Sequence, residues 1–200
     1  MIRRFISFSA RTKHYVYAII TKNRWKVSFV MLIIPRDFYL LPATEVAPAL
    51  CGKLLCVKSE DGSIIRRRIT ETECYYGEED TACHAHRGMT ERTRTLYLEG
   101  GVAYVYLCYG IHNLFNIVTG PAGHPEAVLI RGVEGAPGPG LLTRALGITR
   151  NHNGVSLVDS GIIWCEDDGY RPDKIEASPR IGIDYAAEAD RLRPWRFTIR

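Results

Sequence analysis

The feature that most constrains the fold is an aromatic strand that runs into a glycine turn and returns, at residues 103–118. Tyr104 and Tyr106 recur at period two, so they share one face of the predicted strand. Tyr109 has the other parity and directly precedes Gly110, the expected tip. The stretch therefore predicts a β-hairpin. Its tyrosines fit two interpretations, a half-buried core or a platform for a nucleobase.

Composition allows one hydrophobic core in one domain. The chain has 200 residues, of which 46% are apolar. The net charge is +4, but residues 1–30 hold seven of the 26 Lys and Arg and none of the 22 Asp and Glu. Residues 31–200 therefore carry 19 basic and 22 acidic residues, a net charge of −3. The domain as a whole gives no electrostatic support for DNA binding, so any nucleic-acid surface must be a local basic patch.

The first 30 residues differ from the rest of the chain because they are basic and contain no acidic residue. Ordinary globular sequence begins after Met31. Three interpretations remain open: an upstream start that is not the natural one, a targeting or membrane-surface segment, and a DNA-binding arm. No apolar run reaches the roughly 18 residues that a membrane-spanning helix needs. We expect residues 31–200 to form the domain, without a membrane partner.

The cysteines indicate a reduced, intracellular protein, cytoplasmic and nucleoid-associated if bacterial, nuclear if eukaryotic. The six are Cys51, Cys56, Cys74, Cys83, Cys108 and Cys165, and they form no Cys-x-x-Cys pair. The one group that could bind a metal is Cys74, Cys83, His84 and His86, with His112 in reserve. Its spacing fits neither common zinc-finger pattern. We therefore predict no metal, and a zinc-dependent hydrolase stays only as an alternative.

Short strands outnumber helices along the chain. Thr44 is predicted to cap a helix that carries Pro48 in or near its first turn. Asp61-Gly62 predicts a second hairpin. The other expected elements are strands at 54–57, 64–70, 127–133, 162–165 and 195–199, a long loop at 77–98 and a helix at 141–146. Parallel crossover units are lacking, so we expect an α+β fold around an antiparallel sheet.

Two carboxylates and an arginine suggest a reactive group. Glu71, Glu73 and Tyr75 have one parity just before the long loop. Two carboxylates this close cannot both be buried and ionised without a cation, and Arg131 is the lone charge in an apolar strand. A general base that activates water is one interpretation, and a buried ion pair without chemistry is the other. Asn116, in another apolar strand, needs a hydrogen-bond partner and could bind a base edge.

Several motifs together resemble one enzyme family. They are Glu-Thr-Glu-Cys-Tyr at 71–75, Glu79–His84, Tyr104–Gly110, Asn116-Ile117 and Leu129–Arg131, and further matches extend the likeness to about residues 34–199. The sequence is similar to the alkyladenine (3-methyladenine) DNA glycosylases, also called methylpurine-DNA glycosylases. The extension before residue 31 has no counterpart in this likeness.

The resemblance implies a monofunctional glycosylase of base excision repair, with a protruding DNA-binding hairpin on a curved sheet. It would flip 3-methyladenine, 7-methylguanine, hypoxanthine or ethenoadenine out of duplex DNA and hydrolyse the N-glycosidic bond. Glu73 would activate the water, and Arg131 would position both. The implied reaction uses no cofactor, and the implied partner is double-stranded DNA bound by a monomer.

The resemblance also implies a pocket and a wedge. Tyr75, His84 and Tyr106 would line the pocket for the extruded base, and Asn116 would test the purine edge. Tyr109 would enter the minor groove and fill the gap in the stack. Tyr106 and Tyr109 have opposite parity, which agrees with two separate tasks.

One loop departs from the family pattern. Thr90-Glu91-Arg92 stands where the family usually has Thr-Pro-Arg, so the rigidity and the phosphate contacts of the loop do not follow from the likeness.

A further alternative is a module that binds damaged DNA without catalysis. Glu73 and Arg131 together argue against it, and DNA binding without release of free base would favour it.

Overall fold

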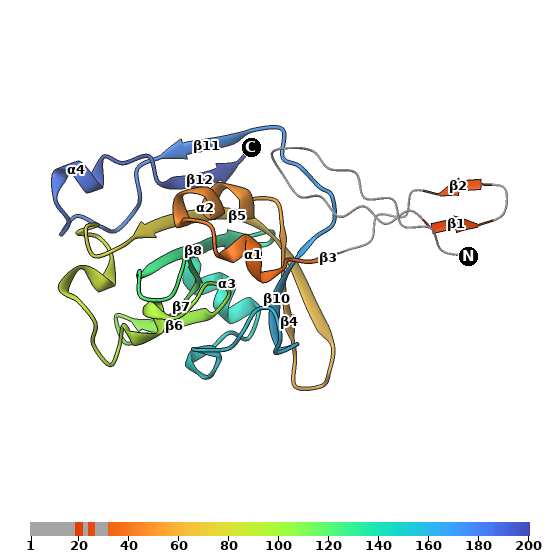
Figure 1. The fold of residues 1–200 in the computed structure, drawn as a ribbon, viewed down its shortest axis with the longest axis horizontal. Coiled ribbons are helices and arrows are strands. Elements are labelled where there is room, and N and C mark those ends of the chain that lie inside the picture. Colours follow the sequence, from red (N-terminus) through yellow and green to blue (C-terminus); the bar gives the residue numbers. More distant parts are fainter. Residues whose placement is uncertain (1–18, 22–23, 27–31) are drawn as a thin grey trace.

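Ten strands join into one open sheet in the part of the chain that the computed structural model describes, residues 19–21, 24–26 and 32–200. Every pairing among them is antiparallel, and the order along the main path is β3-β10-β4-β5-β8-β7-β6 (Figure 1). The strands are β3 (Leu32–Ile33), β4 (Leu54–Lys58), β5 (Ile64–Tyr76), β6 (Ala103–Cys108), β7 (His112–Thr119), β8 (Glu126–Val133), β9 (Ala136–Pro137), β10 (Ile163–Asp167), β11 (Ile175–Ser178) and β12 (Arg196–Ile199). The α+β prediction is confirmed.

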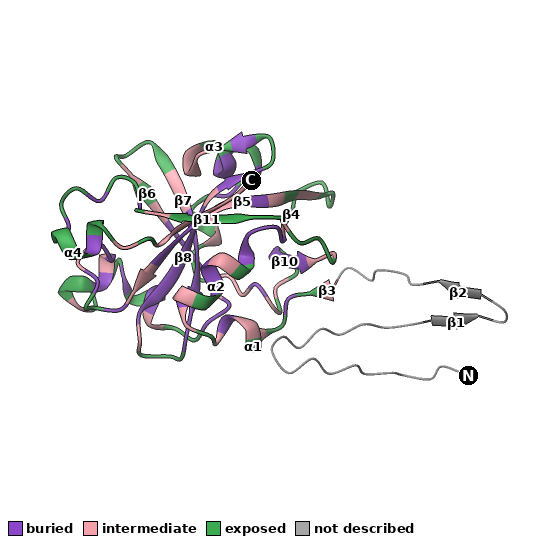
Figure 2. Cartoon of the chain, turned by 90° about the horizontal axis from the view of Figure 1, so that it is seen from above, coloured by how far each residue is buried: buried purple, intermediate pink, exposed green. Residues whose placement is uncertain are grey.

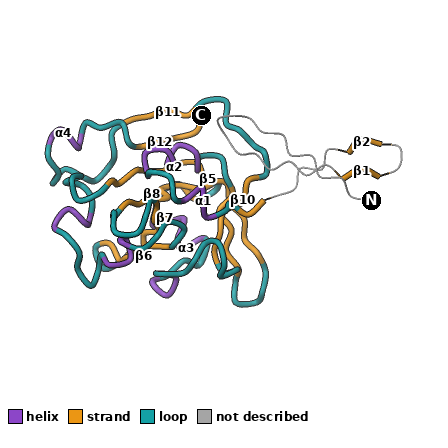
Figure 3. The backbone as a smooth tube through the Cα atoms, viewed as in Figure 1, coloured by secondary structure: helices purple, strands orange, loops and turns teal. Residues whose placement is uncertain are grey.

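Among the residues that the structure describes, four short α-helices and three 3-10 helices accompany the sheet, and loops make up much of the chain between them (Figure 3). They are α1 (Arg36–Tyr39), α2 (Ala43–Leu50), α3 (Pro139–Ala145), α4 (Glu188–Arg191), η1 (His84–Arg87), η2 (Arg94–Tyr97) and η3 (Arg150–His152). The long loop predicted at 77–98 thus contains η1 and η2. No helix among the described residues is long and apolar enough to cross a membrane.

The interpretations of residues 1–30 fall largely outside the described residues. Within that stretch, β1 (Ile19–Thr21) and β2 (Arg24–Lys26) pair with each other as a separate two-stranded sheet. The larger sheet starts at β3. The division at Met31 therefore stays a prediction.

Strand β5 is the axis of the sheet, because it pairs along its length with β4, β8 and β12. The sequence predicted a strand that begins at residue 64 and ends at Thr70-Glu71. That end is wrong, since the strand continues to Tyr76. The register to β8 shifts twice, between Ile69 and Glu71 and between Glu71 and Thr72. A β-bulge of this kind inserts a residue and changes which side chains face one side of the sheet.

The two shifts reverse the side-chain pattern in mid-strand. Ile69 packs in the main core, and so does Cys74, although an odd and an even position of a regular strand face opposite sides. On β8, Ile130 and Val133 both reach this core across the same irregularity. The residues that alternate with Cys74, among them Glu73, are thereby turned away from the core.

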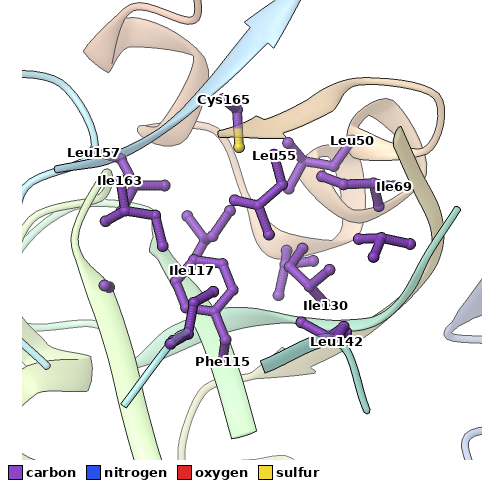
Figure 4. Packing of buried hydrophobic residues seen from close by; sticks show 14 of the residues in the cluster. Leu50, Leu55, Ile69, Phe115, Ile117, Ile130, Leu142, Leu157, Ile163 and Cys165 are labelled. Atoms are coloured by element: carbon purple, nitrogen blue, oxygen red, sulfur yellow. The ribbon is translucent and has the colours of Figure 1, made fainter. Parts of the chain in front are cut away.

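The main core lies between the sheet and helices α2 and α3. Phe115, Ile117, Ile130 and Leu142 are fully buried there, and the close-up shows them in one cluster with Leu55 and Ile69 (Figure 4). Strand β8 is buried along most of its length, as the purple ribbon at the centre of Figure 2 shows. Burying each large aliphatic side chain contributes about 1.5–3 kcal/mol. This core therefore stabilises the sheet from the side that Glu73 does not face.

Two predictions about α2 are wrong. Thr44 is not the N-cap, because the helix begins at Ala43 with Pro42 before it, and Pro48 lies beyond the first turn. The Glu126 carboxylate on β8 instead accepts the Ala43 N–H at 2.6 Å. A side chain 83 residues away thus accepts a hydrogen bond from a free N–H at the helix start, as a local N-cap residue otherwise would. Helix α3 similarly starts two residues earlier than predicted, at Pro139.

Candidate active site

Glu71, Glu73 and Arg131 meet on the face of the sheet that the register shifts turn away from the core. Arg131 Nε donates to Glu71 Oε1 at 3.1 Å, and its Nη1 lies 3.5 Å from Glu73 Oε1. The sequence predicted one carboxylate partner for this arginine, and the structure gives it two. Arg196 Nη1 also donates to Glu71 Oε1, at 3.2 Å. The four side chains form an alternating row of charges.

The two carboxylates differ in their surroundings. The Glu73 side chain has no exposed surface, whereas that of Glu71 keeps 19%. Glu73 Oε2 accepts a hydrogen bond from the Tyr75 hydroxyl at 2.9 Å, and Oε1 accepts one from the Ile181 N–H at 2.8 Å. Glu73 is therefore held on both oxygens in a dry setting, and Glu71 serves as a bridge between two arginines.

Burial raises the pKa of Glu73 above its ordinary value, and Arg131, the Ile181 N–H and the Tyr75 hydroxyl each oppose the rise. Such a carboxylate binds a proton more readily than a solvated one. A pKa raised toward the working pH is what general-base catalysis needs. Tyr75 shares the pocket, and burial raises the pKa of its hydroxyl as well, so it stays a hydrogen-bond donor.

A cleft of about 1270 Å³ opens beside these groups. Its lining includes Tyr75, His84, Tyr106, Tyr109, Asn116 and Arg131. All the base-pocket residues predicted from the sequence thus share one cavity. Glu73 lies directly behind this lining, in contact with Tyr75, Arg131 and Ile181. The cleft is large enough for a purine and the backbone on either side of it.

Three aromatic rings form one wall of the cleft. His84 Nδ1 hydrogen-bonds the Tyr104 hydroxyl at 3.1 Å, and its ring centre lies 4.5 Å from that of Tyr106. Burial, and then the positive charge of Arg92, lower the pKa of His84 to about 4. The guanidinium of Arg92 lies 5.4 Å from the centre of the Tyr106 ring. The wall therefore presents neutral rings with one cation above them.

Asn116 and Tyr109 occupy the two ends of the hairpin. Asn116 is 5% exposed and donates from Nδ2 to the Tyr104 carbonyl at 3.2 Å, so one of its N–H groups is already bound. Tyr109 at the tip is 90% exposed, with a left-handed φ of 49° ahead of Gly110. A bulky residue rarely adopts that conformation. The hairpin thus offers one buried polar group and one fully presented aromatic ring.

Sequence reasoning missed a second wall, at residues 179–187. Arg180 and Asp80 form an ion pair in which both side chains are completely buried. Ile181 and Tyr185 line the cleft, and the Tyr185 hydroxyl donates to the Ala82 carbonyl at 2.9 Å. The only signal in the sequence was that these residues fall within the family likeness, which extends to about residue 199 and implied no role for them. Partners about 100 residues apart leave no local pattern.

The side chains of the zinc alternative are not brought together. Cys74 packs in the main core, and Cys83 packs in a smaller cluster with Ala85 and Leu96. In the described part of the chain, no three His, Cys, Asp or Glu side chains are placed to hold one metal ion. All six cysteines are free, and five of them are buried.

Comparison with known proteins agrees with this geometry. The family described as "Methylpurine-DNA glycosylase (MPG)" matches residues 37–137 and 134–200. A relative from Methanocella arvoryzae is 47% identical over 187 residues, covering 84% of this chain and 92% of its own. Relatives from Psychrobacter cryohalolentis and Bdellovibrio bacteriovorus are each 42% identical, covering 80% and 84% of this chain and 89% and 96% of their own. All three bear the name "Putative 3-methyladenine DNA glycosylase".

The chain belongs to the methylpurine-DNA glycosylase family. It is a DNA glycosylase, a DNA-repair hydrolase that cleaves N-glycosidic bonds, and its partner is DNA. Membership weighs against a module that only binds damage and against a zinc-dependent hydrolase. The matched residues begin at 37 and include every residue of the cleft.

Proposed function

We propose that the cleft receives an alkylated or deaminated purine flipped out of duplex DNA, and that Glu73 activates the water that attacks C1′. Candidate lesions are 3-methyladenine, 7-methylguanine, hypoxanthine and ethenoadenine. The observation that carries the proposal is the fully buried Glu73, held by Arg131, Tyr75 and the Ile181 N–H directly behind an aromatic cleft. This arrangement suits a general base better than a structural ion pair.

The proposed reaction follows from the chemistry of the substrate. A purine alkylated at N3 or N7 is positively charged, so its glycosidic bond is weakened and breaks through an oxocarbenium-like transition state. Glu73 takes a proton from the attacking water, the new C1′–O bond forms, and the C1′–N bond electrons leave with the base. Arg131 keeps the Glu73 carboxylate in place and lies on the cleft side of it.

The aromatic wall supplies the binding of the flipped base. Tyr106 and Tyr75 offer rings for an electron-poor purine, and cation–π attraction adds to the stacking of a charged lesion. His84 and Asn116 lie where they can contact the polar edge of the base. Extrusion costs a few kcal/mol of stacking, least for a damaged or mispaired base. Tyr109, presented at the hairpin tip, would fill the gap and offset part of that cost.

The decisive experiment compares the two neighbouring carboxylates. Glu73→Gln keeps the shape but removes the proton acceptor, so we expect near-normal binding of lesion DNA and base release at least about 100-fold slower. Glu71→Gln should show a milder loss, because Glu71 touches Arg131 and not the proposed water. Single-turnover release of hypoxanthine and of a methylated purine measures both.

Neutral hypoxanthine should suffer at least as much from Glu73→Gln as a cationic purine, whose bond breaks more readily unaided. A near-normal Glu73→Gln, or an inactive Glu71→Gln beside it, would move the base to the other carboxylate.

The proposed function resides in residues 31–200, acting as a monomer. Residues 1–30 precede the family match, and the charge asymmetry of the chain falls at Met31. Deleting residues 1–30 should leave the unfolding midpoint and the single-turnover rate unchanged. An insoluble or inactive truncated protein would show that the extension belongs to the domain.

A further inference from the structure

Residues 179–187 lie between β11 and α4, and a buried ion pair holds them against the sheet. Arg180 Nη2 donates to Asp80 Oδ1 at 2.8 Å, and Nη1 donates to Asp80 Oδ2 and to the Cys74 carbonyl of β5. A charged pair taken fully out of water is costly unless its geometry and remaining hydrogen bonds are satisfied. Hydrophobic packing alone would fill this space more cheaply, so the pair calls for a further explanation.

Asp80 extends the network to the opposite segment. Its carboxylate accepts the backbone N–H of Tyr76 at 3.2 Å and that of Ala82 at 3.1 Å. The Arg180 guanidinium lies 4.8 Å from the centre of the Tyr75 ring. The pair therefore ties the end of β5, the turn before His84 and the 179–187 segment into one unit.

Ile181, the residue after Arg180, contacts Glu73, the proposed general base. The Ile181 N–H donates to Glu73 Oε1 at 2.8 Å. The guanidinium of Arg180 is held by bonds to Asp80 and to the Cys74 carbonyl, and this anchors the segment directly before that N–H. We propose that Arg180, held by Asp80, is a positioning residue that aims the Ile181 N–H at the Glu73 carboxylate and fixes the Tyr75 ring beside it. This inference rests on Glu73 being the general base.

The Ile181 N–H is one of two neutral donors that bond to the Glu73 carboxylate, the other being the Tyr75 hydroxyl. The charged or titratable groups near this carboxylate are Arg131 on β8, Glu71 and Tyr75 on β5, Arg196 on β12, and Tyr185. Arg131 is shared with Glu71, to which it is closer. The Ile181 N–H bonds to Glu73 alone, so its loss should act directly on the ionised form of the base.

An amide-to-ester replacement at Ile181 tests this bond without changing a side chain. It removes the N–H and keeps the backbone shape. We expect the acid limb of the single-turnover rate profile to move about one unit toward higher pH, as for the loss of one hydrogen bond to a charged group. On that limb, release should be about tenfold slower, while the rate at the plateau changes much less. The matched control is the ester at Ala186, whose N–H bonds to the Ile183 carbonyl and not to Glu73.

A paired substitution tests whether Arg180 acts through that N–H. Asp80→Asn with Arg180→Met removes both charges, so neither is left buried alone. The single Asn oxygen can still accept one of the two backbone N–H groups, which bond to different oxygens of Asp80. We expect the same shift of the acid limb as for the Ile181 ester. Adding the ester to the paired substitution should shift it little further, because contacts in one network are not additive.

Three results decide the inference. An acid limb that stays in place in the Ile181 ester overturns it. A paired variant that is less stable but keeps the parental acid limb assigns Arg180 a structural role only, and overturns it too. If Glu73→Gln releases base normally, the proposed function fails instead, and that variant is measured in the same series so that the two failures are told apart.

Discussion

The hairpin of β6 and β7 and the segment at 179–187 both line the cleft, yet different contacts hold them. In the hairpin, Ala103 to Cys108 pair residue by residue with Ile117 to His112, all close in sequence. The 179–187 segment has no strand or helix of its own, and its bonds to Asp80 and Glu73 join residues 100 to 108 positions apart. One wall is specified locally and the other by buried polar contacts between distant segments. Removing a single side chain should therefore lower the stability of the protein more in the 179–187 wall than at the tip of the hairpin.

The largest effect on stability is expected at Asp80. Asp80→Asn alone leaves the Arg180 charge buried without its counter-ion, which should lower the free energy of unfolding by about 3–5 kcal/mol. Urea unfolding measures it. The exposed pair of Glu91 and Arg94 gives the matched control, since Glu91→Gln should change little. A loss below about 1 kcal/mol for Asp80→Asn would mean that other contacts hold this wall.

The same contrast explains what could be predicted from the sequence. The aromatic hairpin was predictable because alternation and a glycine turn are local signals. The alternation along the strand also predicted that Glu73 and Tyr75 share one face. It did not predict the register shifts that turn this face away from the core. They depend on how β5 meets β8, which no single segment encodes.

The second wall of the cleft and the cap of α2 could not be predicted from the sequence for another reason. Arg180 gains meaning only beside Asp80, and the Ala43 N–H is bound by Glu126, although Thr44 looked like the better cap. In both cases a tertiary partner replaced a local one. The family resemblance singled out Glu73, Arg131 and the pocket residues, and the structure brings them to one cleft. Their individual roles stay predictions.

The tip of the hairpin should contribute to DNA capture and little to folding. Tyr109 is 90% exposed, so Tyr109→Ala should leave the unfolding midpoint unchanged. It should weaken capture of the flipped state by about 1–3 kcal/mol, as expected for loss of one stacking contact. A fluorescent base analogue in lesion DNA reports the flipped state. Tyr106→Ala, in the aromatic wall of the cleft, is the matched control and should alter base preference instead. An unchanged reporter signal for Tyr109→Ala would contradict the wedge.

A further effect is expected only in acid, and it should act on the aromatic wall through His84. The ordinary pKa of a histidine is 6.5, and burial and Arg92 lower that of His84 to about 4. Between these values the unfolded chain binds a proton at this position and the folded protein does not, so stability falls as pH falls from about 6.5 to about 4. Above 6.5 both states are neutral and the contribution is fully present. Histidine signals in NMR spectra should show His84 titrating near pH 4, and Arg92→Gln should raise that midpoint. His84→Gln should remove this part of the pH dependence of unfolding, and an unchanged slope in that variant would mean that the acid sensitivity arises elsewhere.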